Sequence, residues 1–183
     1  MGFELARVFA EKGAEVSLIT GPTQQIIEHS NVIRYDVKNA AQMYDKTVEC
    51  FENCDIAILS AAVADYTPKS TFNTKLKKKT DNLVVELVPT KDILAELGKR
   101  KKENQILVGF ALETDNELEN AKEKLLRKKL DCIVLNSLND AGAGFNVPTN
   151  KVTILDAKGN IYNSDLKSKY EVALDISEKI LNL

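Results

Sequence analysis

The stretch of sequence that decides the fold is Asp55-Ile56-Ala57-Ile58-Leu59-Ser60. A continuous apolar run of this length predicts a strand that is buried on both faces, as the strands of a parallel sheet are. Strand-like and helix-like segments alternate on either side of this run. The expected strands are 15–20, 32–37, 55–60, 83–88, 106–112 and 132–135, and the expected helices are 1–12, 39–52, 92–101 and 116–129. The alternation predicts an α/β fold with a doubly wound, Rossmann-like, mostly parallel sheet.

Two segments depart from this alternation. Residues 151–155 and 160–163 flank Ala157-Lys158-Gly159 and predict a hairpin at an antiparallel margin of the sheet. A last helix should follow, and we expect Ser164-Asp165 to cap it. Residues 66–80 are polar and rich in Lys and match no element, so we expect residues 66–88 to form an inserted flap or arm.

Length and composition indicate one globular domain spanning residues 1–183. The chain is 44% hydrophobic and 28% charged, which suffices for one core. Its 25 Lys and Arg residues nearly balance 27 Asp and Glu residues, and this balance argues against a nucleic-acid partner. No apolar run approaches the roughly 18–20 residues that span a bilayer, and the first residues do not form a signal peptide. We therefore expect a cytoplasmic protein that does not bind a membrane.

The number of cysteines agrees with a cytoplasmic location. Cys50, Cys54 and Cys132 are odd in number, which is not typical of a disulfide framework. Cys50 and Cys54 lie four positions apart and would share one face of a helix, so a metal pair is conceivable. The single His29 is remote from them, and we favour free thiols.

The N-terminal region lacks part of a familiar pattern. A mononucleotide-binding half starts with a strand, continues with a glycine-rich turn and then enters a helix. Here the helix comes first, and Gly2 would be the last glycine of the turn. We therefore expect a domain that is incomplete at its N-terminus.

Candidate ligand-binding residues cluster where expected strands end, because doubly wound folds bind ligands beyond the carboxyl ends of their strands. Small residues at 60–64 would admit a ligand, and Asp65 would bind a ribose hydroxyl or a metal ion. The alternative is a tight strand exit with a solvated Asp65. Residues 88–92 and 109–114 end two further strands. Phe110 would flank a flat base or fill the core.

Two groups of lysines could bind phosphates. Lys75 and Lys77, within Lys75-Leu76-Lys77-Lys78-Lys79, would share one face of a strand and point two ammonium groups the same way. Lys124 and Lys128 lie four positions apart on one helix face. A solvated charged face is the alternative for both groups. The loop Gly142-Ala143-Gly144-Phe145-Asn146 has two glycines without the spacing of a phosphate loop.

Together these residues resemble the phosphopantothenate–cysteine ligase family. The blocks AAVADY (61–66), KLKK (75–78) and GFALET (109–114) occur in the family's order and spacing, and residues 127–131 and 144–146 fit as well. The resemblance covers essentially the whole chain. It implies that 4'-phosphopantothenate and L-cysteine are joined to 4'-phosphopantothenoylcysteine in coenzyme A biosynthesis. The AAVAD and GFALET blocks look bacterial, which implies CTP as co-substrate and an acyl-cytidylate intermediate.

The resemblance also implies roles for individual residues. Asp65 and Lys75 are the expected catalytic residues: Asp65 would contact the nucleotide and its Mg2+, and Lys75 would reach the polyphosphate or the acyl-cytidylate. The nucleotide-binding residues carried over from the family are Ala61, Ala62, Asp65, Lys75, Thr90, Lys91, Asp92, Ile93, Phe110, Lys124 and Lys128.

The family pattern has consequences for partners and for completeness. Members pair through the inserted arm, which implies a homodimer whose arm closes over a neighbour's site. A flavin-dependent decarboxylase, to which the domain is fused in many bacteria, is a candidate partner. Family members also carry a strand, a turn and a phosphate-binding loop ahead of the segment that matches Met1-Gly2.

Two other functions remain open. A Rossmann oxidoreductase that binds NAD(P) would carry its fingerprint in the missing strand and turn, and Asp36 is a candidate for its ribose-binding acid. A truncated, non-catalytic nucleotide-binding subunit is the second. Stabilisation by NADPH but not by CTP would favour the oxidoreductase, and CTP binding without amide formation would favour the subunit.

Overall fold

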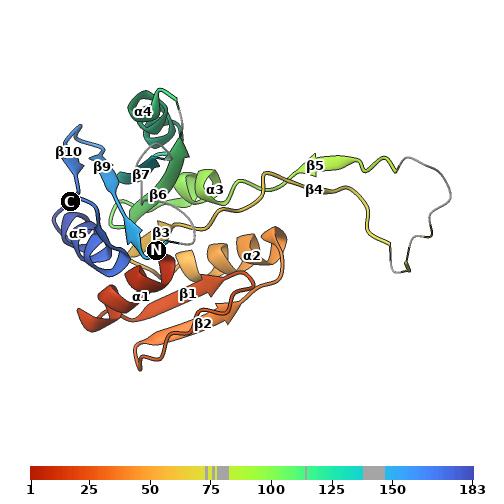
Figure 1. The fold of residues 1–183 in the computed structure, drawn as a ribbon, viewed down its shortest axis with the longest axis horizontal. Coiled ribbons are helices and arrows are strands. Elements are labelled where there is room, and N and C mark those ends of the chain that lie inside the picture. The colour runs from red at the N-terminus through yellow and green to blue at the C-terminus, as the bar shows by residue number, and fades with distance from the viewer. Residues whose placement is uncertain (73, 76, 78–82, 114, 138–146) are drawn as a thin grey trace.

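A five-stranded mixed sheet forms the centre of the fold (Figure 1). The computed structural model describes residues 1–72, 74, 75, 77, 83–113, 115–137 and 147–183. In sheet order the strands are β10 (Ile161–Asn163), β9 (Val152–Asp156), β7 (Cys132–Ser137), β6 (Ile106–Glu113) and β3 (Ile56–Leu59). The strands β3, β6 and β7 are parallel, whereas β9 and β10 form an antiparallel hairpin at the margin. The predicted α/β fold and its C-terminal hairpin are confirmed.

Two helical layers cover the sheet. On one face, α1 (Gly2–Glu11) and α5 (Lys169–Leu181) pack against alternate residues of the strands, among them Val108 and Val134. On the other face, α2 (Ala40–Phe51), α3 (Ile93–Arg100) and α4 (Glu117–Arg127) pack against Leu107, Ala111 and Ile133. Alternation along β6 therefore decides which side chains point to which helical layer.

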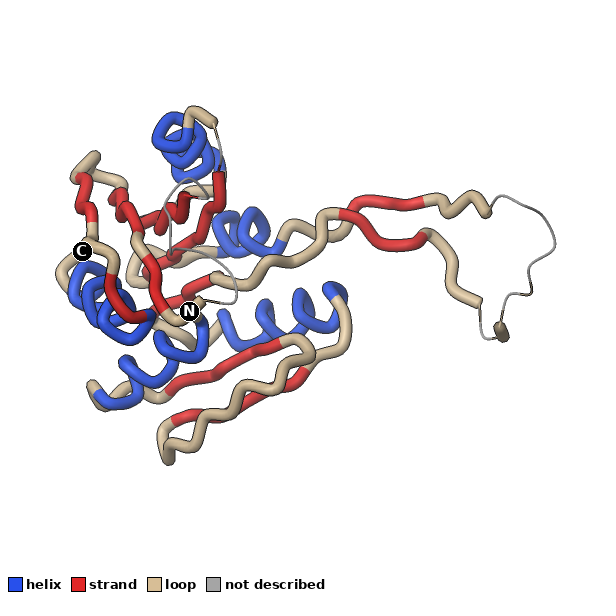
Figure 2. Tube along the Cα trace, in the orientation of Figure 1, coloured by secondary structure: helices blue, strands red, loops and turns tan. Residues whose placement is uncertain are grey.

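A separate parallel pair extends the architecture. It consists of β1 (Val16–Thr20) and β2 (Val32–Asp36), in register from Val16 opposite Val32 to Thr20 opposite Asp36. Within the described residues, no strand pairs with the second edge of β1 or with the outer edge of β3. The predicted parallel sheet is thus present in two parts, and Figure 2 shows the β1–β2 pair apart from the five strands.

Helix ends follow local capping chemistry. The side chain of Asn39 accepts a hydrogen bond of 2.9 Å from the amide of Gln42 and begins α2. Gly13 follows α1 with a φ of 91°, a left-handed conformation that glycine adopts without strain.

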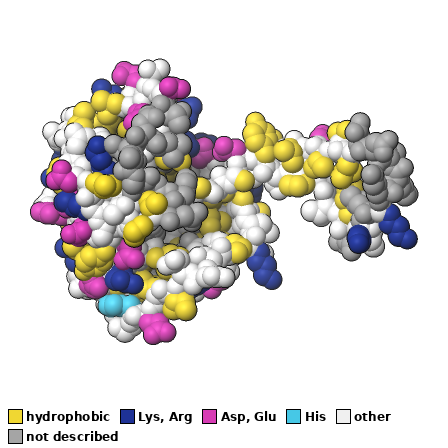
Figure 3. Space-filling view, viewed as in Figure 1, with side chains coloured by type: hydrophobic (Ala, Val, Ile, Leu, Met, Phe, Trp, Pro, Cys, Tyr) yellow, Lys and Arg dark blue, Asp and Glu magenta, His cyan; other side chains and the backbone are white. Residues whose placement is uncertain are grey.

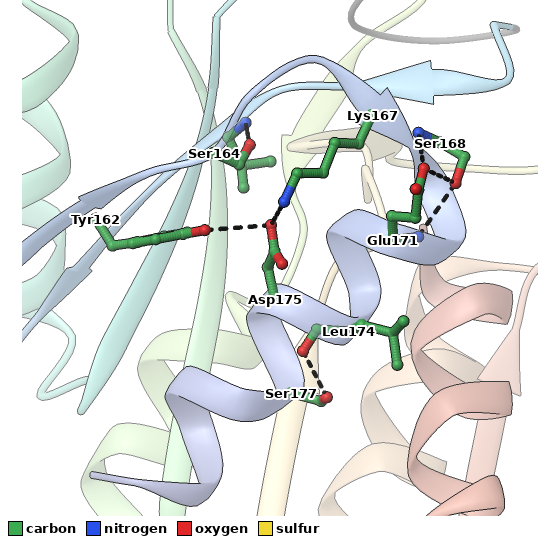
Figure 4. A network of polar contacts seen from close by, with 9 residues as sticks. Tyr162, Ser164, Lys167, Ser168, Glu171, Leu174, Asp175 and Ser177 are labelled. Atoms are coloured by element: carbon green, nitrogen blue, oxygen red, sulfur yellow. Dashed lines mark hydrogen bonds and ion pairs between the residues drawn. The ribbon is translucent and has the colours of Figure 1, made fainter.

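The cap of α5 differs from the expectation. Ser168 caps this helix in a capping box with Glu171, which Figure 4 shows. The prediction of a cap at Ser164-Asp165 is wrong, because Ser164 is buried and its hydroxyl accepts a hydrogen bond from the amide of Val152. Ser164 therefore fastens the end of the hairpin. Two short strands, β8 (Thr149–Asn150) and β11 (Lys167–Ser168), pair ahead of the helix.

The arm is a two-stranded ribbon that projects from the sheet (Figures 1 and 2). It is formed by β4 (Tyr66–Pro68) and β5 (Leu87–Pro89), which are antiparallel. The predicted strand 83–88 is wrong in extent: residues 83–86 are not in a strand, and Leu83 and Val84 are 73% and 90% exposed. A β-rich sequence without a layer to pack against forms no long strand. Hydrophobic side chains line the projecting arm in Figure 3.

Candidate active site

The root of the arm joins two of the predicted ligand-binding segments. The hydroxyl of Thr90 donates a hydrogen bond of 2.7 Å to the carbonyl oxygen of Ala64. The amide of Thr90 donates another, of 2.8 Å, to the carbonyl oxygen of Asp65. The exit from β3 and the entry into α3 are therefore held side by side at the base of the antiparallel β4–β5 ribbon, whereas the prediction had residues 88–92 follow a strand of the parallel sheet.

Asp92 connects this root to helix α4. Its carboxylate caps α3 by accepting a hydrogen bond of 2.9 Å from the amide of Ala95, and Lys128 Nζ lies 2.8 Å from its second oxygen. Burial alone would raise the pKa of the Asp92 carboxyl. The hydrogen bonds from Lys128 and Ala95 outweigh burial, and the pKa lies below its ordinary value.

Lys124 lies one turn before Lys128 on the same face of α4. Its ammonium donates a hydrogen bond of 3.0 Å to the carbonyl oxygen of Phe110 on β6. Burial, followed by the positive charge of Lys128, lowers the pKa of Lys124. The two lysines are therefore not an ordinary solvated face: each contacts a protein acceptor near the carboxyl end of the sheet, and Lys128 is only 13% exposed.

The side chains of Phe110 and Ile93 are directed into the two hydrophobic cores. Phe110 packs against the core beneath α1 and α5, on the face of β6 opposite to α3 and α4. Ile93 is 6% exposed within the other core. Phe110 thus brings its carbonyl oxygen, rather than its ring, to Lys124. Ile93 has its backbone in the first turn of α3, directly after Asp92.

Lys91 extends the cationic surface toward α2. Its ammonium lies 4.3 Å from the centroid of the Tyr44 ring, a distance typical of a cation–π contact. Sequence patterns do not mark Tyr44 as a candidate site residue. Its contact with a candidate site residue depends on the packing of α2 beside α3, which no local pattern encodes.

The segment after β3 remains open to a ligand. Ala61, Ala62 and Asp65 are all exposed. Among the described residues, no group of three or more His, Cys, Asp or Glu side chains is arranged to hold a metal ion. A magnesium ion at Asp65 would therefore take most of its oxygen ligands from nucleotide phosphates and water, which suits the coordination habits of Mg2+.

The arm carries Lys75 and Lys77 away from this cluster. Both lysines are exposed, and the arm that bears them projects from the sheet in Figure 1. The structure therefore brings together the root of the arm, Asp92, Lys124 and Lys128, and leaves Lys75 outside their contacts. Lys78, Lys79, Thr114 and the loop 142–146 lie outside the described residues.

The other sequence candidates have structural contacts of their own. The carboxylate of Asp36 accepts hydrogen bonds of 2.7 and 3.0 Å from Arg34.

Cys50, Cys54 and Cys132 are free thiols, as predicted. Burial raises the pKa of Cys132 to about 12. In the part of the chain that the structure describes, no helix has the length and apolar character to cross a membrane.

The parallel strands, their two helical layers and the polar groups at Asp65, Asp92, Lys124 and Lys128 define a doubly wound α/β domain with a candidate ligand site at its sheet edge. Residues 1–183 match the family described as the DNA/pantothenate metabolism flavoprotein C-terminal domain, and the chain belongs to this family.

Known relatives agree with this assignment. The chain is 54% identical over 183 residues to a "Cysteine/Cysteine sulfinic acid decarboxylase" of an unknown prokaryotic organism, covering 100% of the chain and 51% of the relative. It is 42% identical to the "Coenzyme A biosynthesis bifunctional protein CoaBC" of Bacillus subtilis (strain 168), covering 100% and 45%. The chain thus spans about half the length of these curated relatives.

A solved structure has the same architecture. The crystal structure of the C-terminal domain of the coenzyme A biosynthesis bifunctional protein CoaBC superposes with a TM-score of 0.81 at 35% sequence identity. The match covers 97% of this chain and 79% of that one.

Proposed function

We propose that this domain catalyses the CTP-dependent ligation of 4'-phosphopantothenate with L-cysteine. The observation that carries the proposal is the cation pair Lys124 and Lys128, held beside β6 by the Phe110 carbonyl and the Asp92 carboxylate. Both acceptors are ones that a phosphate oxygen could replace. Membership of the family and the likeness to CoaBC proteins support a role in coenzyme A biosynthesis.

The proposed chemistry has two steps. The carboxylate of 4'-phosphopantothenate attacks the α-phosphorus of CTP, which forms the acyl-cytidylate and releases pyrophosphate. The amine of cysteine then attacks the acyl carbon, the amide bond forms and CMP leaves. Negative charge collects on the phosphates in the first step, where fixed cations lower the barrier most.

The residues would divide this work as follows. Lys124 and Lys128 would bind phosphate oxygens, and Asp65, exposed after β3, would supply one carboxylate to a Mg2+ ion that arrives with CTP. The exposed Ala61 and Ala62 would let the nucleotide approach the backbone. Lys75 would reach the polyphosphate or the acyl-cytidylate from the arm.

The arm is the proposed dimer contact. Tyr66, Phe72 and Leu87 are 60%, 65% and 53% exposed along it, more apolar surface than one chain covers. The arm carries Lys75 away from the candidate site of the same chain. In the proposed dimer, Lys75 would therefore reach the site of the second copy. A flavin-dependent decarboxylase remains a proposed partner, and the cytoplasm the proposed location.

A strand from outside residues 1–183 would complete the site. Among the described residues, β1 and β3 each have one unpaired edge, both belong to parallel pairs, and α1 packs against apolar residues of both strands. A further parallel strand between them would place its carboxyl end beside Gly2, whose Cβ position would lie 3.0 Å from Ser60 Oγ. We propose that this strand and the loop after it provide the rest of the phosphate-binding site.

The function is tested by mixing the protein with CTP, Mg2+, 4'-phosphopantothenate and L-cysteine and following the amide product by mass spectrometry. Residues 1–183 and a chain extended upstream to include the additional strand are compared. We expect product and pyrophosphate in equal amounts, with a higher rate for the extended chain. Product with ATP but not CTP would overturn the nucleotide assignment, and no product from the extended chain with either nucleotide would overturn the function.

A further inference from the structure

Gly98 lies at a point where α3 meets the end of α4 without space for a side chain. It is buried in α3, and a Cβ atom added to it would lie 2.0 Å from the carbonyl oxygen of Lys128 and 3.0 Å from its carbonyl carbon. Glycine weakens a helix interior relative to alanine. A methyl group at this position would require the backbone of Lys128 to move, because a carbonyl group cannot rotate away as a flexible side chain can.

Hydrogen bonds and buried side chains hold the end of α4 in a fixed position. The amide of Leu130 donates to the carbonyl oxygen of Leu125 at 3.0 Å, and that of Lys129 donates to Leu126 at 3.2 Å, which is a Schellman motif. Lys129 has a φ of 53°, and Leu125 and Leu130 are both buried in the core beneath α3 and α4. The last turn therefore has a fixed position against the sheet, and Gly98 fixes its distance from α3.

This contact determines the reach of the Lys128 side chain. Gly98 touches the Lys128 backbone, while Asp92, six positions earlier, accepts from its ammonium at 2.8 Å. Six residues of helix rise about 9 Å, so the lysine must extend along α3 from one point to the other. Displacing the Lys128 backbone would move the ammonium away from Asp92.

We propose that Gly98 is a positioning residue: the absence of its side chain seats the last turn of α4 against α3 and thereby places the Lys128 ammonium at Asp92 for phosphate binding. The phosphate role rests on the proposed function, whereas the placement of the ammonium does not. Gly98 itself touches no ligand in this proposal.

The test compares Gly98→Ala with Gly21→Ala, whose added methyl group would have nothing within 4 Å. Both are made in the extended chain and in a Lys129→Gly background, where glycine suits the left-handed φ and keeps the last turn of α4 folded. Carbon NMR titration of the Asp92 carboxyl reports the placement of the ammonium without any ligand. Calorimetric titration with CTP and Mg2+ reports the affinity, and Lys128→Met is combined with each glycine variant.

We expect Gly98→Ala to raise the Asp92 pKa and weaken CTP binding about tenfold, while Gly21→Ala changes neither. In the Lys128→Met background, Gly98→Ala should cause no further loss of affinity. An unchanged Asp92 pKa in folded Gly98→Ala protein would overturn the proposal. A further loss of CTP affinity when Gly98→Ala is added to Lys128→Met would overturn it too. A raised pKa in a protein that binds no CTP before substitution would uphold the placement and reject the proposed function.

Discussion

The hydroxyl oxygen of Thr90 lies 2.7 Å from the carbonyl oxygen of Ala64, so a single side-chain hydrogen bond closes the root of the arm between residues 26 positions apart. The backbone hydrogen bond from Thr90 to Asp65 lies beside it. Together they join the arm to the edge of the sheet at the place where the proposed nucleotide site begins.

Thr90→Val removes the hydroxyl donor and keeps the shape of the side chain. We expect the free energy of unfolding to fall by about 0.5–1 kcal/mol, since the bond is partly exposed and the Ala64 carbonyl can bind water instead. Urea unfolding measures the change. Thr67→Val, on the exposed strand β4, is the matched control and should leave the midpoint unchanged. Equal midpoints for the two variants would contradict a role of the hydroxyl at the root.

Lys128→Met tests the cation pair. The substitution keeps an unbranched apolar stem and removes the ammonium that lies beside Asp92, so we expect CTP affinity to fall about tenfold, or roughly 1.4 kcal/mol of binding energy. Lys122→Met alters an exposed lysine of the same helix and should bind CTP as the unsubstituted protein does. Isothermal titration in the presence of Mg2+ distinguishes them. Similar losses for both variants would point to general charge rather than to a built site.

Cys132 predicts a dependence of stability on alkaline pH. Its pKa is raised from 9.0 to about 12 by burial, so the folded state keeps the thiol protonated where the unfolded state has lost the proton. The stabilisation that the protonated thiol gives the folded state is therefore fully present below pH 9. It is lost between pH 9 and 12, at about 1.4 kcal/mol per pH unit. Urea unfolding at pH 8.5–10.5 should show a shallower decline for Cys132→Ala than for the unsubstituted protein. Parallel declines would contradict the buried thiol.

The same burial predicts the order in which the thiols react. Cys132 is 1% exposed, whereas Cys50 and Cys54 are partly exposed. At pH 8, a thiol reagent should modify Cys132 last, and only as fast as the protein opens. Peptide mapping after timed quenching identifies each site. Early modification of Cys132 in folded protein would be inconsistent with its position in the core.

Asp175 provides a control network that shares no residue with the cation pair, and Figure 4 shows its contacts. Its carboxylate contacts Lys167 at 2.8 Å and the Tyr162 hydroxyl at 3.3 Å. Burial and then the negative charge of Asp175 raise the pKa of Tyr162. Asp175→Asn should therefore lower the Tyr162 pKa and leave CTP affinity unchanged. Ultraviolet difference spectra that isolate the Tyr162 signal measure its pKa during an alkaline titration. A large loss of CTP affinity would show that the C-terminal network couples to the site.

Most strand and helix positions could be predicted because each element has its own local pattern of apolar and polar residues. The apolar run at 55–60 became β3, and the charged helix at 116–129 buries Ala121 and Leu125 as its inner residues. The segments 60–65 and 88–92 do come together, but not as the ends of parallel strands: β5 pairs antiparallel with β4, and the hydrogen bond from Thr90 to Asp65 closes the base of that ribbon. Ser164 does not cap α5 because the nearby Ser168-x-x-Glu171 pattern is the stronger capping signal.

The parts that escaped prediction depend on contacts between distant elements. The direction of the Phe110 ring follows from the register of β6 between two helical layers. The role of the Lys128 side chain requires the approach of α3 and α4 at Gly98, and a glycine within a helix was the only local trace of it. The division of the parallel sheet between β1 and β3 likewise has no signature in either strand.

The division of the sheet has a consequence for how this domain opens. No ladder of hydrogen bonds joins the β1–β2 pair to the five central strands among the described residues, and its attachment passes through side-chain packing with α1 and α2. Without the proposed strand between β1 and β3, such a unit can detach without breaking the larger sheet, so in residues 1–183 the amide protons of β1 and β2 should exchange with solvent well before those of β6 and β7. The root of the arm and the cation pair belong to the slower unit, and they would outlast that partial opening.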